Sequence, residues 1–111
     1  MNRDYKLFIQ DIIDSINIIQ KYVQGINEDQ FKKDLKLQDA VIRRLEIIGE
    51  ATKNIPRSVK EINKEIPWSK ISNYRDFIIH SYFGASLQRI WEVAIKDMPK
   101  LKESLQRIKL L

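Results

Sequence analysis

The chain has 111 residues, of which 43% are hydrophobic and 32% charged, and its formal net charge is +5. This length usually makes one domain with a modest core, so we expect a single domain over residues 1–111. Because cysteine is absent, the composition excludes a disulfide framework, a thiolate metal site and a cysteine nucleophile. We find no signal peptide and no apolar run near the ~20 residues of a membrane span, and we therefore expect a cytoplasmic protein.

Apolar residues recur at helical spacing through the first half of the chain. The pattern predicts an amphipathic helix over residues 3–24, which Gly25 then stops. Asn27 and Gln30 have the spacing of a capping box, so a short helical turn should begin there. A second long helix is predicted over residues 35–54.

The second half predicts shorter helices. One spans residues 57–66, and another begins after Ser69 as its N-cap and runs to about residue 83. A last helix over residues 86–108 should be bent by Pro99 without necessarily ending there. With no strand-like alternation, the sequence predicts an all-α fold, a small up-and-down bundle of four to five helices.

The first predicted helix is apolar over a wide arc, with paired isoleucines at nearly every turn. A small bundle can have more apolar surface than it buries alone, which favours a homodimer formed through helix faces. Alternatively, the same surface covers a larger core within one chain. Periodicity alone leaves both interpretations open.

Four residues with the chemistry of a phosphate-cleaving site lie within eight positions: Arg75, Asp76, His80 and Tyr82. His80 is the only histidine, and histidine titrates near neutral pH without help. Arginine stays protonated and binds phosphate oxygens with two donors at once. As helical i, i+4 neighbours, Asp76 and His80 share a face, so the carboxylate can accept the imidazole N–H and orient the ring.

Helix geometry does not bring all four residues together. Arg75 and His80 are separated by roughly 140° around an ideal helix, whereas Arg75 and Tyr82 lie on one stripe. A composite site therefore needs the reach of the arginine, an irregular turn near Tyr74, or a second copy of the helix across a dimer axis. On spacing alone, a lone helical histidine is more often structural than catalytic.

Two longer segments carry a family resemblance. Residues 67–82 (PWSKISNYRDFIIHSY), followed by residues 90–91 (IW) and 98–101 (MPKL), resemble the HepT-like ribonuclease toxins of the HEPN superfamily. Residues 40–51 (AVIRRLEIIGEA) resemble the second signature of the same family, in the same order and spacing.

The resemblance implies a helical, homodimeric, metal-independent endoribonuclease that acts on RNA as the toxin of a toxin–antitoxin pair. It implies no metal and no cofactor. The motif of the family falls on Arg75, Asp76 and His80 as catalytic residues, with Asp76 where many members have asparagine. It further implies that Tyr82 accepts adenylyl groups from an MntA-type nucleotidyltransferase antitoxin, which silences the toxin.

Two other functions remain as alternatives. The chain could be a non-catalytic helical partner or binding subunit of a nucleotidyltransferase. Its positive charge could also serve plain nucleic-acid binding, although basic and acidic residues alternate along most of the chain.

Residues of the second long helix supply weaker candidates. Glu46 and Glu50 are i, i+4 and could hold a metal, but an ion-paired face with Arg43 and Lys53 is the preferred interpretation. Arg43 and its neighbour Arg44 could line an RNA groove. Gly49 within this helix lowers helix propensity by about 1 kcal/mol relative to alanine, and close helix packing is the expected reason.

Overall fold

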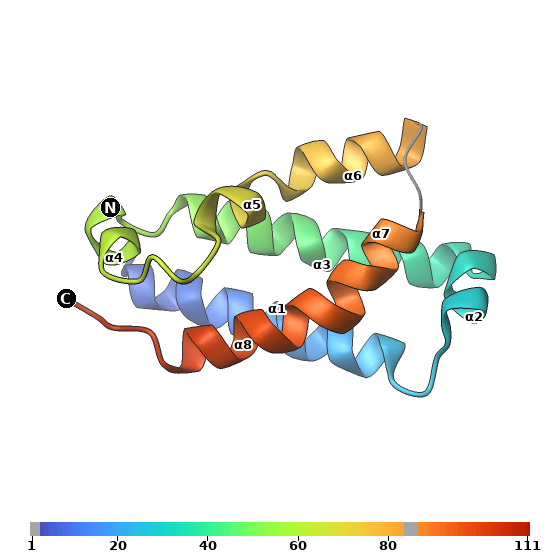
Figure 1. Ribbon diagram of the computed structural model, residues 1–111, viewed down its shortest axis with the longest axis horizontal. Coiled ribbons are helices and arrows are strands. Elements are labelled where there is room, and N and C mark those ends of the chain that lie inside the picture. The colour runs from blue at the N-terminus through green and yellow to red at the C-terminus, as the bar shows by residue number, and fades with distance from the viewer. Residues whose placement is uncertain (1–2, 84–86) are drawn as a thin grey trace.

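The computed structural model describes residues 3–83 and 87–111, with only the backbone described for residues 80–83. Within these ranges every regular element is helical, which confirms the predicted all-α fold. None of the described helices is long and apolar enough to cross a bilayer. In chain order (Figure 1) the elements are α1 (Tyr5–Val23), α2 (Glu28–Lys33), α3 (Leu35–Lys53), α4 (Arg57–Glu61), α5 (Trp68–Ser72), α6 (Tyr74–Phe83), α7 (Leu87–Glu92), the π-helix η1 (Val93–Asp97) and α8 (Met98–Gln106).

Two long helices form the centre of the bundle. The chain runs along α1 and returns beside it along α3, so the two are antiparallel (Figure 1). The η1 and α8 segments pack against α1, whereas α5 and α6 pack against α3. The α7 helix links the two sides, because it contacts both α2 and α6.

Local signals place the ends of the first helices as predicted. After α1, Gly25 has φ of 73°, a left-handed conformation that glycine adopts without steric cost. The predicted capping box is present, since the Asn27 side chain accepts from the Gln30 N–H at 2.9 Å and the Gln30 side chain accepts from the Asn27 N–H at 2.9 Å. Aspartates not singled out from the sequence, Asp4 and Asp34, cap α1 and α3.

The boundaries of two predicted helices differ from the sequence pattern. The helix expected over residues 57–66 ends at Glu61, because the side chain of Asn63 bonds to the backbone one turn earlier and competes with the helix. The next helix begins at Trp68, before the expected cap Ser69, and it divides into α5 and α6 at Asn73. The other predicted cap, at residue 86, lies outside the described residues.

The last helix continues through Pro99, in agreement with the sequence. The α7, η1 and α8 segments follow one another without a gap, and Pro99 lies near the start of α8. Proline has no N–H to give to the carbonyl one turn earlier. The π-helix immediately before it rearranges the hydrogen-bond pattern at this point, a common way for a helix to absorb such an interruption.

The isoleucines of α1 are used mainly by the core of a single chain. Ile12, Ile16 and Ile19 are almost fully buried, and Ile9 is 7% exposed. The larger-core interpretation therefore accounts for most of the apolar arc of this helix. Apolar side chains that stay exposed are spread over several helices, among them Ile79 on α6, which is 47% exposed.

Gly49 lies where α3 meets the junction of α5 and α6. A Cβ atom added to it would stand 3.2 Å from the Ile71 carbonyl oxygen and 3.6 Å from the Tyr74 Cβ. Such a contact is tighter than most Cβ atoms tolerate, so the absent side chain lets the junction rest on the α3 backbone. The close packing expected from the sequence at this glycine is confirmed.

A buried asparagine holds the C-terminal segment to the loop after α4. The Asn63 amide donates to the carbonyl oxygens of Val59 at 2.8 Å and Lys109 at 2.9 Å, and its Oδ1 accepts from the Lys109 N–H at 2.8 Å. The Trp68 indole donates to the Asn63 carbonyl oxygen at 3.0 Å. The Asn63 side chain thus connects α4 to the C-terminal segment, and its backbone carbonyl binds Trp68.

We expect Asn63→Ala to lower the free energy of unfolding by about 2–4 kcal/mol, because three side-chain hydrogen bonds are lost at a buried position. Urea denaturation measures the change. Asn54→Ala is the matched control, since the Asn54 amide donates to the Glu50 carbonyl oxygen on the exposed surface and should cost less than about 1 kcal/mol. Equal losses in the two variants would contradict the assigned role.

Candidate functional site

The α6 helix carries all four predicted site residues on continuous helical backbone. Arg75 and Asp76 are exposed, and neither side chain makes a hydrogen bond or ion pair with another described residue. The side chains of His80 and Tyr82 lie outside the described residues. Their backbone positions keep the expected helical spacing, with position 80 one turn beyond Asp76.

Arg75 faces a groove bounded by three helices, which we call the α3 groove. It has a volume of about 410 Å³. Its walls include Phe8 and Asp11 of α1, Arg43, Glu46 and Glu50 of α3, and Arg75 of α6.

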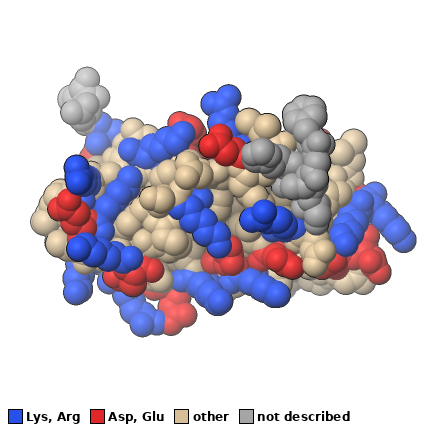
Figure 2. Space-filling view, turned by 45° about the horizontal axis from the view of Figure 1, so that its top comes forward, with Lys and Arg blue, Asp and Glu red and all other residues tan. Residues whose placement is uncertain are grey.

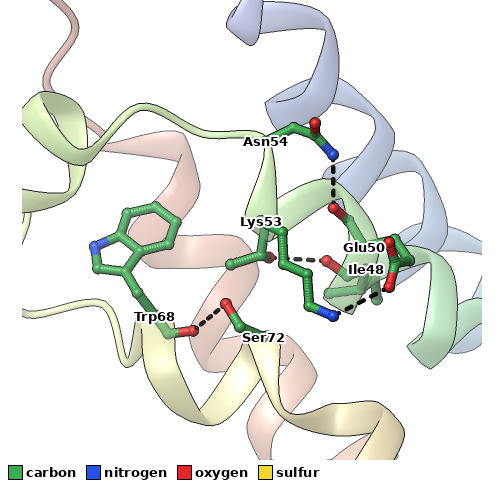
Figure 3. Close-up of polar contacts among 7 residues, drawn as sticks. Ile48, Glu50, Lys53, Asn54, Trp68 and Ser72 are labelled. Carbon is green, nitrogen blue, oxygen red and sulfur yellow. Dashed lines mark hydrogen bonds and ion pairs between the residues drawn. The ribbon is translucent and has the colours of Figure 1, made fainter.

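Two of the carboxylates in the α3 groove are neutralised by cations at its edge. Asp11 forms an ion pair with Arg3. Glu50 pairs with Lys53 at 3.2 Å, and the Glu50 carbonyl oxygen accepts from the Asn54 amide at 2.9 Å (Figure 3). The pairing of Glu50 with Lys53 agrees with the ion-paired face expected from the sequence.

Asp76 faces a second groove on the other side of α6, which we call the α7 groove. Its volume is about 530 Å³. The residues around it include Lys70, Asp76 and Phe77 on one side and Arg89, Lys96 and Asp97 on the other.

Interactions inside the α7 groove leave it nearly balanced in charge. Lys70 pairs with Asp97 at 3.1 Å, and the Arg89 guanidinium lies over the Phe77 ring, 5.2 Å from its centroid. Tyr74 also lines this groove, and burial, with a smaller contribution from Asp97, raises the pKa of its phenol. The phenol therefore stays neutral at physiological pH and is unsuited to act as a base.

The two neighbouring residues of the predicted motif thus face different grooves. Arg75 borders the α3 groove and Asp76 the α7 groove, as expected for consecutive positions about 100° apart on a helix. The break at Asn73 precedes both residues and does not bring them together. Among the described residues of one chain, the predicted orienting carboxylate and the predicted phosphate-binding arginine therefore lie at different grooves.

The two tryptophans of the chain have structural contacts. Trp68 donates its indole N–H to a backbone carbonyl, and Trp91 packs on Phe31 with ring centroids 5.3 Å apart. Within the described ranges, no group of three or more His, Cys, Asp or Glu is placed to hold a metal ion. Lysine and arginine side chains are spread over the visible face with acidic residues between them (Figure 2), as the alternating sequence suggested.

The profile of the family described as Ribonuclease HepT-like matches residues 12–108. The chain belongs to the HepT-like family.

Its relatives are mostly of similar length. It is 40% identical over 109 residues to a protein named "Probable ribonuclease HepT" from Thermococcus cleftensis, covering 98% of the chain and 99% of that protein. It is 38% identical over 101 residues to "Putative RNase TTE0752" from Caldanaerobacter subterraneus, covering 91% of the chain and 90% of that protein. No solved structure matches the chain.

One relative is about twice as long. The HepT-like chain is 46% identical over 108 residues to "Gamma-glutamylcyclotransferase and putative RNase MJ0434" from Methanocaldococcus jannaschii. This alignment covers 97% of the chain but 49% of that protein, so the chain spans about half of this relative.

Sequence reasoning missed the contribution of α1 to the groove that holds Arg75. Phe8 and Asp11 belong to a helix more than sixty positions away from Arg75 in the chain, and nothing in their spacing indicates such a contact. The one available signal was the helical spacing of Arg43 and Glu46, which places them on one face of α3. This signal identifies the groove only when it is known which face of α3 the α6 helix covers.

Proposed function

We propose that this HepT-like chain is a metal-independent endoribonuclease that acts as the toxin of a toxin–antitoxin pair. Family membership supports ribonuclease activity, and two relatives bear the names of ribonucleases over nearly the whole length of the chain. The observation that carries the proposal is Arg75, an exposed guanidinium that borders a groove and has no ion-pair partner among the described residues. A cation in this state is free to bind a phosphate.

The proposed reaction uses the RNA 2′-hydroxyl as its own nucleophile. A base removes the 2′-hydroxyl proton, the oxygen attacks the adjacent phosphorus, and the bond to the 5′-oxygen breaks as that oxygen receives a proton. We assign the acid–base role to His80, with Asp76 as its orienting carboxylate, and stabilisation of the phosphoryl charge to Arg75. These groups suffice in principle without a metal.

The division of α6 between two grooves favours a site built by two chains. In such a site, Arg75 of one chain binds the phosphate of the bond that His80 of a second chain helps to cleave. A homodimer with α6 near its axis would bring these two side chains together. The exposed Ile79 on the same helix supplies apolar surface for such a contact.

Modification of Tyr82 would silence the enzyme. We propose that a nucleotidyltransferase antitoxin of the MntA type transfers adenylate to the Tyr82 oxygen from a nucleoside triphosphate, releasing pyrophosphate. Positions 75 and 82 are seven residues apart on α6 and lie on one stripe. The added nucleotide would therefore place negative charge beside Arg75 and exclude RNA by charge and volume.

Purified, unmodified protein is expected to cleave RNA in the presence of EDTA. His80→Ala and Arg75→Ala should each lower the rate by about a hundredfold or more, since each removes a group that acts on the reacting phosphate. Arg107→Ala, which removes an exposed arginine on the far end of α8, is the matched control and should cleave normally. Lack of cleavage by the intact protein would instead favour a non-catalytic partner of a nucleotidyltransferase.

Mixing the two inactive variants tests the shared site. Random pairing of Arg75→Ala and His80→Ala chains makes half of the dimers mixed, and each mixed dimer has one intact composite site of two, so activity should return to about a quarter of the wild-type value. The mixture is assayed after dissociation and reassembly. If Arg75 and His80 of the same chain form the site, the mixture stays inactive.

Co-expression with a nucleotidyltransferase of the proposed type should add one or more adenylates to the chain, and Tyr82→Phe should abolish the addition. Intact-mass analysis measures the adduct. Tyr22→Phe is the control, because Tyr22 is an exposed tyrosine on α1 at 40% exposure. An adduct that persists in Tyr82→Phe would assign the modification to another residue.

A further inference from the structure

The α3 groove contains a second arginine in the same state as Arg75. Arg43 of α3 is exposed, borders the groove, and makes no hydrogen bond or ion pair with any other described residue. Arg75 comes from α6, so the two guanidiniums belong to different walls of one groove. Arg44, the next residue along the helix, is half-buried and does not line the groove.

The charge inside the α3 groove favours an anion. The carboxylates of Asp11 and Glu50 are already paired with Arg3 and Lys53. The groups that have no ion-pair partner among the described residues are two guanidiniums, Arg43 and Arg75, and one carboxylate, Glu46, which leaves a net charge of +1. The groove volume of about 410 Å³ is of the size that holds a small organic ligand such as a nucleotide.

The α7 groove lacks this excess of positive charge. Three of the residues that line it are cations and three are carboxylates, and Lys70 is already paired with Asp97. The Arg89 guanidinium lies over an aromatic ring, and Asp76 would repel a phosphate. Of the two grooves beside α6, the α3 groove is therefore the one suited to the RNA backbone.

We propose that Arg43 is a second phosphate-binding residue, and that a single strand of RNA lies along the α3 groove with successive phosphates on Arg43 and Arg75. The proposal rests on the ribonuclease function proposed above and adds the path of the substrate. Arg43 acts as a positioning residue: it holds a phosphate next to the one that is cleaved. The carboxylate of Glu46 lines the same groove, and its negative charge weakens phosphate binding.

Binding is measured separately from cleavage, with a fluorescent RNA oligonucleotide that carries 2′-O-methyl groups and so lacks the nucleophile. Arg43→Ala should weaken its binding about tenfold and lower the slope of log affinity against log salt by about 0.7, the value for one phosphate contact to a single strand. Glu46→Gln should tighten binding a few-fold, because it removes the unpaired carboxylate.

Two controls remove the same charge elsewhere. The first is Arg44→Ala, at a residue next to Arg43 on α3 that does not line the groove. The second is Lys96→Ala, at a residue that lines the α7 groove. Both should bind the oligonucleotide within about twofold of wild type. With cleavable RNA, Arg43→Ala should raise KM and leave kcat nearly unchanged, a split that a positioning role predicts and a folding defect does not.

The proposal is overturned if Arg43→Ala binds like wild type, if either control loses as much affinity, or if the wild-type protein does not bind the oligonucleotide. The experiments distinguish failure of the groove proposal from failure of the ribonuclease proposal. Binding that depends on Arg43 without any cleavage would support the groove and reject the nuclease. Cleavage that does not respond to Arg43→Ala would support the nuclease and reject the groove.

Discussion

The position of α6 depends on one close approach, that of the α5–α6 junction to α3 at Gly49. Because this residue has no side chain, the Ile71 carbonyl can lie over the α3 backbone, where its oxygen would stand 3.2 Å from an added Cβ, a tighter contact than most Cβ atoms make. Since α3 is itself packed along α1, the contact sets all three walls of the α3 groove. A residue without functional groups thus contributes to where the arginine of α6 stands relative to the arginine of α3.

The same packing divides the helix that carries the motif. One side of α6 borders the groove of Arg75, and the other borders the groove of Asp76. Consecutive positions on a helix are about 100° apart, so Arg75 and Asp76 point in different directions. This division is the reason why the proposed chemistry is linked to a dimer.

Differences in charge on this protein are local. Figure 2 shows basic and acidic residues intermixed on the visible face, so the net charge of +5 is not gathered into one broad patch there. The difference between the two grooves lies in which charges are already paired. Asp11 and Glu50 are paired with cations at the edge of the α3 groove, whereas the Lys70–Asp97 pair removes one charge of each sign from the α7 groove. An anionic substrate would respond to the unpaired charges.

The sequence by itself determined the all-α class, the first helices with the stop at Gly25 and the capping box at Asn27, and the family, because helical periodicity, capping boxes and motif spacing are local properties. It also indicated that Arg75 and His80 diverge on an ideal helix. Only the tertiary structure decided that Asn63 binds the C-terminal segment at Lys109, and that Arg43 and Arg75 share a groove with α1. These contacts join positions that are distant in the chain, and they depend on which helix faces meet, which no local pattern specifies.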